Sequence, residues 1–164
     1  MKDVVTTSSP GEPTVALDEW TRSFDRLYRR SDELYHRIAR GCGVSDACYW
    51  LMYAIYACGG SAPVSYLNEE GGYPKQTVSS ALRTLERKGY VSSDFVAGSR
   101  KAKLVSFTEE GGAFAAEKIV PANRAERRAF KTLDESEQAE MLRLVDKYVA
   151  AIEGELAAME GEAK

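Results

Sequence analysis

The sequence has few of the residues on which catalysis and metal binding depend. Its single histidine, His36, lies among charged residues, a pattern that predicts a position on the surface of a helix. The three cysteines, Cys42, Cys48 and Cys58, are odd in number and follow no zinc-ligand spacing. No glycine-rich phosphate loop follows a strand, and no carboxylate pair stands out. We therefore expect a protein that is not an enzyme and that carries no metal ion or cofactor.

The sequence also has no long hydrophobic run. The most apolar stretch, Tyr49–Cys58, is too short to cross a bilayer, which takes about 20 residues, and we expect it to be a buried helix. The first 14 residues, "MKDVVTTSSPGEPT", lack the apolar centre of a secretory signal. They predict a disordered lead over residues 1–14. No membrane partner is expected, and the predicted location is the cytoplasm.

Charge is unevenly distributed along the chain, although the net charge is only −3. Residues 74–103 carry seven basic and two acidic side chains, a local charge of +5. Residues 133–164 carry nine acidic and three basic side chains, a local charge of −6. Local sign matters more to a polyanionic partner than the overall balance does. The basic centre therefore indicates an acidic partner.

The basic region begins with "PKQTVSSALRTLERKGYV", residues 74–91. Val78, Leu82 and Leu85 follow the i, i+4, i+7 spacing of a helix with one buried side. At about 100° per residue, the opposite side gathers amides, hydroxyls and guanidinium groups. Those residues are Gln76, Ser80, Arg83 and Arg87. A side of this composition suits hydrogen-bond recognition of an acidic molecule.

The neighbours of this helix complete a helix-turn-helix pattern. A short helix is predicted over Pro63–Glu70, then a glycine turn, then a helix over Pro74–Lys88 that Gly89 ends. Two strands, Tyr90–Val96 and Lys103–Phe107, form a hairpin with a basic tip. Because an α-helix fits the major groove, double-stranded DNA is the expected partner. The predicted DNA contacts are Lys75, Gln76, Thr77, Ser79, Ser80, Arg83 and Arg87 on the helix, with Arg100 and Lys101 at the tip reaching a minor groove.

Two long helices at opposite ends of the chain carry heptad apolar spacing. One is predicted over Leu17–Arg40, and the other follows a capping-box-like start at Asp134 and Glu137. Between them, a helix from Thr108 to Lys131 is expected to kink at Pro121. Both seams exceed what one small domain needs to cover, so we expect a homodimer on a near-palindromic site. The predicted interface residues are Leu17, Trp20, Phe24, Leu142, Val145, Val149, Ile152 and Leu156.

In this order, the elements resemble the MarR family of winged-helix transcriptional regulators. "QTVSSALRTLERKGYV" is similar to the family's recognition helix, with its Leu-Glu-x-x-Gly exit. "GSRKAKLVSFTEEG" is similar to its wing, which ends in Thr-x-x-Gly, and "LDESEQAEMLRLVDKY" to the start of its last dimer helix. The family's wing commonly carries Asp-x-Arg, whereas this chain has Gly98-Ser99-Arg100 and lacks the acid.

The resemblance implies a mainly α fold with a small β-hairpin wing. It implies a dimerisation helix over residues 15–44, a winged helix-turn-helix over 45–110 and further dimerisation helices over 111–160. It also implies a repressor that responds to a small molecule bound between the dimer helices and the winged domain. Tyr28, Tyr49, Trp50 and Tyr53 would line that pocket and receive a flat, apolar effector of aromatic, phenolic or anionic kind.

Two alternatives to this function remain open at the level of sequence. Winged helices also serve as protein–protein adaptors, and fold alone does not fix function. DNA affinity that falls steeply with salt would separate a regulator from an adaptor. A thiol-based redox sensor is the second alternative, because Cys42 lies in a polar Gly-Cys-Gly segment at the end of the first helix.

Overall fold

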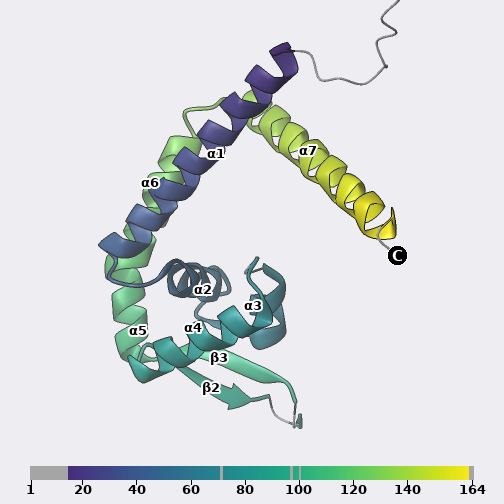
Figure 1. Ribbon diagram of the computed structural model, residues 1–164. Helices are drawn as coiled ribbons and strands as arrows, with labels where there is room; N and C mark the ends of the chain where they lie inside the picture. The colour runs from purple at the N-terminus through teal and green to yellow at the C-terminus, as the bar shows by residue number, and fades with distance from the viewer. Residues whose placement is uncertain (1–14, 71, 97, 100, 163–164) are drawn as a thin grey trace, which may run out of the picture.

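The computed structural model describes residues 15–70, 72–96, 98–99 and 101–162. It is mostly helical with one small antiparallel sheet, which confirms the predicted fold class (Figure 1). The predicted lead over residues 1–14 lies outside the described residues. In chain order the elements are α1 (Val15–Gly41), α2 (Asp46–Ala57), β1 (Ser61–Pro63), α3 (Val64–Glu70), α4 (Lys75–Arg87), β2 (Val91–Phe95), β3 (Lys103–Phe107), α5 (Glu109–Phe114), the π-helical turn η1 (Ala115–Ile119), α6 (Val120–Phe130) and α7 (Glu135–Glu162).

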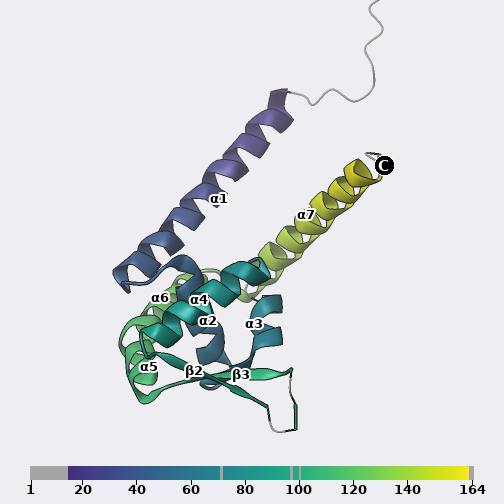
Figure 2. The same cartoon turned by 60° about the horizontal axis from the view of Figure 1, so that its bottom comes forward.

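The hydrophobic core lies where α2, α3 and α4 pack over the sheet, with η1 closing one side (Figures 1 and 2). Helix α2 is buried or half-buried as far as Ile55, with Leu51, Met52 and Ile55 fully inside. The prediction of a buried helix over Tyr49–Cys58 is wrong for its end, because Tyr56, Ala57 and Cys58 are exposed. It begins at Ser45, whose side chain accepts a hydrogen bond from the Cys48 N–H at 3.4 Å. Full burial of a leucine or isoleucine side chain stabilises a fold by roughly 1.5–3 kcal/mol. Helix α2 therefore supports helices α3 and α4, which pack against it.

The sheet has three strands in the order β1-β3-β2, one more strand than the sequence predicts. Strand β1 pairs with β3 with Ala62 opposite Val105, and both side chains are fully buried. The Ser61 hydroxyl donates to the Ser106 hydroxyl at 2.8 Å. With three residues and a proline at its end, β1 is too short to show the alternation that identifies a strand.

Helix α5 begins against the end of α4, at a contact that only glycine permits. The Thr108 side chain accepts from the Gly111 N–H at 2.9 Å and donates to the Gly89 carbonyl at 2.5 Å. The Thr108 N–H in turn donates to the Tyr90 carbonyl at 3.1 Å. A Cβ on Gly111 would lie only 1.7 Å from the Tyr90 carbonyl oxygen. The Thr-x-x-Gly pattern thus joins the exit of α4 to the start of α5.

From α5 the chain continues through η1 and α6 as one helical run (Figure 1). Pro121 has no N–H to donate, and it is the second residue of α6, just after the π-helical turn and Val120. In that turn the Val120 N–H donates to the Ala115 carbonyl, five residues earlier. Helix α7 then begins with the predicted reciprocal cap: the Glu137 N–H donates to Asp134 Oδ1 at 2.9 Å, and the Asp134 N–H donates to Glu137 Oε2 at 2.8 Å.

Helices α1 and α7 extend away from this body as two arms (Figures 1 and 2). The Phe24 ring on α1 and the Tyr148 ring near the middle of α7 meet edge to face, with centroids 4.8 Å apart. Over the described residues, no helix is long and apolar enough to cross a membrane. In the same part of the chain, no group of three or more histidine, cysteine or carboxylate side chains is placed to hold a metal ion.

Candidate nucleic-acid interface

Helix α4 is fixed firmly at both ends. Pro74 precedes it, and its carbonyl accepts from the Thr77 N–H at 2.8 Å. At the other end Gly89 takes a left-handed conformation with φ +74°, which glycine adopts without strain. The Tyr90 N–H donates to the Leu85 carbonyl at 3.0 Å, and the Gly89 N–H donates to the Glu86 carbonyl at 2.9 Å. These two bonds form a Schellman motif, which ends the helix sharply before the wing.

One side of α4 is buried and the other faces solvent, as its sequence predicts. Val78, Leu82 and Leu85 are buried against the core. Thr77 is half-buried, while the other predicted contacts on this helix are exposed: Lys75, Gln76, Ser79, Ser80, Arg83 and Arg87. The Arg83 Nε donates to the Ser79 carbonyl at 3.3 Å. Among the described residues, neither Arg83 nor Arg87 forms an ion pair.

The single acid of α4, Glu86, is turned toward the sheet. The Ser93 hydroxyl on β2 donates a hydrogen bond to the Glu86 carboxylate. This bond also ties α4 to the wing, because Ser93 lies in the middle of the β2 strand. The negative charge is therefore held beside the wing strand, and the exposed side of α4 is left to cations, amides and hydroxyls.

The wing is β2, β3 and the tip between them. Gly98 occupies the position of the family's wing acid. The hydroxyl of the next residue, Ser99, accepts from the Lys101 N–H at 3.2 Å and the Ala102 N–H at 2.9 Å. The Ser99 N–H donates to the Val96 carbonyl at 2.9 Å, so the serine orders the turn without a carboxylate. Lys101 is exposed at this tip. Arg100, also a predicted contact, lies outside the described residues.

A polar concavity of about 520 Å³ runs beside α4, toward the start of α2. Gln76, Thr77 and Ser80 line it from α4, and Ser45 lines it from the cap of α2. The structure thus brings part of the predicted helix contacts to one concave surface. Such a surface can accept hydrogen bonds and contacts from a rigid, polar partner that lies along the helix.

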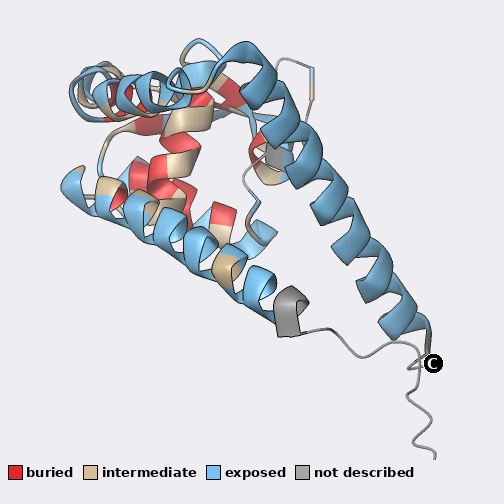
Figure 3. Cartoon of the chain, turned by 90° about the horizontal axis from the view of Figure 1, so that it is seen from above, coloured by how far each residue is buried: buried red, intermediate tan, exposed pale blue. Residues whose placement is uncertain are grey.

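The two predicted seams lie open along α1 and α7. Trp20 on α1 is 75% exposed and Leu142 on α7 is 61% exposed. Phe24, Val145, Val149, Ile152 and Leu156 are exposed as well, whereas the side chain of Leu17 lies outside the described part. Figure 3 shows α7 exposed along its whole described length. Exposed apolar stripes of this length are typical of surfaces that a partner covers.

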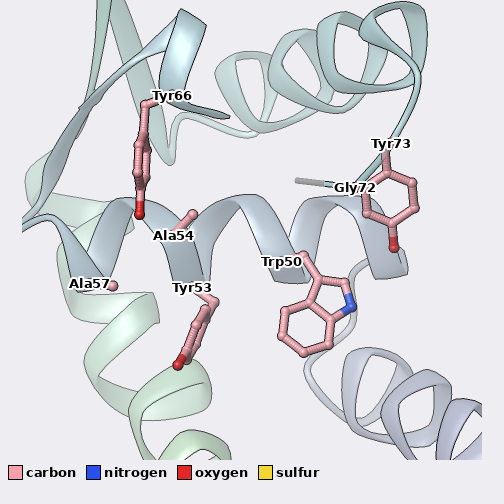
Figure 4. Close-up of a pocket in the computed structure, with 7 residues that line it drawn as sticks. All are labelled: Trp50, Tyr53, Ala54, Ala57, Tyr66, Gly72 and Tyr73. Atoms are coloured by element: carbon pink, nitrogen blue, oxygen red, sulfur yellow. The ribbon is translucent and has the colours of Figure 1, made fainter. Parts of the chain in front are cut away.

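Of the four predicted pocket residues, the structure brings two together. Trp50 and Tyr53 line a cavity of about 440 Å³ formed by α2, α3 and the turn before α4 (Figure 4). Tyr49 does not line it, because its ring is directed into the core and is only 1% exposed. Tyr28 does not line it either, since it is exposed on α1. Sequence reasoning missed Tyr66 and Tyr73, which close the cavity from α3 and the turn.

Residues 43–101 match the sequence model of the MarR family. This match covers the segment from the start of the winged body to the wing tip, which is therefore similar to the MarR family. No curated protein gives a match.

Several solved MarR-family structures share the fold. AbsC from Streptomyces coelicolor is 16% identical, with a TM-score of 0.73 over 88% of this chain and 99% of that one. Sco3205 from the same organism, solved in complex with DNA, is 19% identical, with a TM-score of 0.70 over 86% and 90% of the two chains. BpsR from Bordetella bronchiseptica, whose DNA binding is regulated by 6-hydroxynicotinic acid, is 18% identical, with a TM-score of 0.59 over 77% and 98%. At these identities the likeness establishes the fold.

The three cysteines all lie among the described residues, and each is a free thiol there. Cys42 is half-buried, and its thiol donates to the Lys118 carbonyl at 3.6 Å. Burial raises the pKa of the Cys42 thiol, and the charge of Lys118 offsets this only in part. A raised pKa lowers the fraction of reactive thiolate. The geometry at Cys42 therefore gives no support to the redox-sensing alternative.

Proposed function

We propose that this protein is a transcriptional regulator of the MarR family that binds DNA in a sequence-specific way. The observation that carries the proposal is the exposed side of α4, which presents cations, amides and hydroxyls while its one acid is bonded to Ser93. An adaptor helix has no need to hold its acid away from the contact surface. A helix that approaches phosphates gains from it, since each uncompensated carboxylate repels the DNA backbone.

In this proposal α4 enters the major groove. Gln76 near its start suits adenine and Arg83 about two turns further on suits guanine, through paired hydrogen bonds to the base edges. Thr77 and Ser79 donate to phosphates and fix the register of the helix on the duplex. Lys101 and Arg100 at the wing reach the neighbouring minor groove, whose negative potential attracts basic side chains.

We further propose that the chain acts as a homodimer through α1, α6 and α7. The 28-residue helix α7 exposes an apolar stripe along its described length, and the stripe of α1 lies open beside its first turns. Two copies that bury these stripes against each other would form a two-fold dimer. Its two α4 helices would then read half-sites roughly one helical turn apart, on a near-palindromic operator. Residues 45–110 would bind DNA, with residues 15–44 and 111–160 supplying the dimer contacts.

The aromatic cavity supports a regulator that responds to a small molecule. BpsR is regulated by an aromatic acid, and another relative, RdhR-CbdbA1625, was solved with 2,4-dichlorophenol. In this chain we propose that a small aromatic effector enters beside Trp50 and Tyr53 and releases the repressor from its operator. Such a regulator acts in the cytoplasm, on the chromosome.

Selection from a pool of random duplexes, at two salt concentrations, tests the DNA-binding function. We expect a near-palindromic motif whose affinity falls steeply as salt rises, because phosphate contacts release counterions. The matched comparison is Glu86→Gln, which removes the acid of α4 but keeps its shape and should not weaken binding. Absence of any enriched motif at low salt, together with a salt-insensitive protein partner, would favour the adaptor instead.

A further inference from the structure

The cavity of about 440 Å³ on α2 is lined by four half-buried aromatic rings. Trp50 and Tyr53 come from α2, Tyr66 from α3 and Tyr73 from the turn before α4. Figure 4 shows Tyr66 and Tyr73 at opposite sides of the view, with Tyr53 and Trp50 between them along α2. The Trp50 and Tyr53 rings meet at 82°, with centroids 5.8 Å apart. Two alanines and Gly72 supply the rest of the lining, so the cavity has aromatic walls and no charged side chain in its lining.

Aromatic walls of this kind prefer one sign of charge. The face of an aromatic ring carries the negative part of its quadrupole, so a cation placed over it is attracted and an anion is repelled. Two or more rings that enclose one position add these attractions. Cages of tryptophan and tyrosine are the usual way in which proteins bind quaternary ammonium groups.

The charged groups around the cavity also favour a cationic ligand over an anionic one. Burial raises the pKa of the Tyr73 hydroxyl, and the negative charges of Asp46 and Asp32 raise it further. Both charged groups that act on Tyr73 are therefore acids. Asp46 also accepts a hydrogen bond from His36 at 2.8 Å. An anionic ligand at the Tyr73 end would meet negative charge with no basic side chain in the lining to offset it.

A third acid lies on the far side of Trp50. The Tyr35 ring packs on Trp50 with centroids 5.0 Å apart, and its hydroxyl donates to the Glu126 carboxylate. Arg127 and Lys131 line a separate concavity of about 430 Å³, which Tyr53 and Glu126 also line. Neither of these two basic side chains belongs to the lining of the cavity itself.

We propose that the cage formed by Trp50, Tyr53, Tyr66 and Tyr73 binds an organic cation, a quaternary ammonium or a flat aromatic cation, as the effector. This inference rests on the proposed function for its regulatory meaning, but the binding site itself does not depend on DNA. It narrows the aromatic effector of the previous subsection to one sign of charge. We expect the cage to bind such a cation more tightly than it binds a phenolate or a carboxylate.

A ligand in the cage would contact the residues that lead into α4. Gly72 and Tyr73 belong to the lining, and the next residues, Pro74 and Lys75, begin the helix. The Pro74 carbonyl accepts the first hydrogen bond of α4, from Thr77. A ligand that moves the Tyr73 ring therefore moves the start of the helix that we propose enters the groove.

Binding can be measured without DNA, because Trp50 is one of only two tryptophans in the chain. In a Trp20→Phe background, all tryptophan fluorescence comes from Trp50. We expect saturable quenching by benzyltrimethylammonium and none by salicylate, an aromatic anion of similar size. Choline should bind more tightly than its uncharged counterpart 3,3-dimethylbutan-1-ol, which has the same shape. Quenching by salicylate alone, or equal binding of choline and the alcohol, would overturn the proposal.

A pair of tyrosine variants locates the site. Tyr73→Leu should weaken benzyltrimethylammonium binding by about 3- to 30-fold, the loss expected for one cation–π contact. Tyr56→Leu changes another tyrosine of similar chemistry at the end of α2, outside the cage lining, and should leave the affinity unchanged. An equal effect of both variants would show that the cation binds elsewhere.

The outcomes also separate this inference from the proposed function. If the protein binds the cation but selects no DNA motif, the proposed regulatory function is refuted and the proposed cation site is supported. If the protein binds an operator but shows no cation binding, in fluorescence or by calorimetry on the unmodified chain, the proposed cation site is refuted and the regulatory function is supported.

Discussion

Gly111 offers the sharpest test of how the winged body is held together. A Cβ built on Gly111 lies 1.7 Å from the Tyr90 carbonyl oxygen and 2.6 Å from its carbonyl carbon. These are backbone atoms, and they cannot rotate away as the end of a side chain can. The Tyr90 backbone is also held on both sides, by bonds to Leu85 and Thr108. Gly111→Ala must therefore push the start of α5 away from the exit of α4.

The size of the effect follows from three contributions. Forced overpacking of a buried position costs about 1–3 kcal/mol, and here the required movement puts it at the upper end. Loss of the bond between the Thr108 side chain and the residue 111 N–H adds about 1 kcal/mol. The better helix propensity of alanine offsets about 1 kcal/mol of this loss of stability. We expect Gly111→Ala to lower the free energy of unfolding by about 3 kcal/mol, from the sum of these contributions.

Gly112→Ala is the matched control in the same helix. No atom lies within 4 Å of a Cβ at Gly112, so this variant should be neutral, or more stable by up to about 1 kcal/mol. Both free energies are measured by urea denaturation at one protein concentration, since association adds to apparent stability. Equal stability of the two variants would refute the reasoning, because it would mean that the α4–α5 junction yields without strain.

Four further predictions address recognition, assembly and the thiols. Arg83→Ala should weaken binding to the selected operator by about 1–3 kcal/mol in fluorescence anisotropy, and an equal loss on unrelated DNA would assign Arg83 to a phosphate instead. Ile152→Lys places a charge in the α7 seam and should yield a monomer in sedimentation velocity; a variant that stays dimeric would remove this seam from the interface. Ser99→Ala removes the acceptor that orders the wing tip and should weaken DNA binding by about 1 kcal/mol at unchanged thermal midpoint, so a fall in the midpoint would point to a wider structural role. At pH 7.5 iodoacetamide should modify Cys42 more slowly than the exposed Cys58, as followed by mass spectrometry, because burial raises the Cys42 pKa and leaves little thiolate; faster reaction at Cys42 would revive the redox alternative.

Local sequence signals predicted those parts of the fold that local interactions determine. The spacing of Val78, Leu82 and Leu85 gives the buried side of α4 because helical period alone decides which side chains share a face. Gly89 ends α4 because a left-handed residue is needed there. The paired caps of Asp134 and Glu137 span three residues and can be read directly from the chain.

Contacts between distant segments were beyond the reach of the same reasoning. The sequence shows an acid in α4, but only the packing of β2 against α4 shows that Ser93 bonds to Glu86. It shows a wing without its acid, and the structure shows that the hydroxyl of the neighbouring Ser99 accepts two backbone hydrogen bonds at the tip. Tyr66 and Tyr73 carry no periodic signal, because they come from a short helix and a turn, and they meet Trp50 only through the fold.

Helix α4 is held at its two ends by contacts that lead to different parts of the molecule. At its start, Tyr73 belongs to the aromatic cage, and Pro74 passes any movement of that turn into the first bond of α4. At its end, Gly89 is bonded to Thr108, from which α5, η1 and α6 continue toward α7. An occupant of the cage and a change in the spacing of the proposed dimer helices would therefore act on the same helix from opposite ends. Since α4 is packed on the core along its buried side, neither end can shift without reorienting its exposed side, and this is the physical basis on which one small ligand could change DNA affinity.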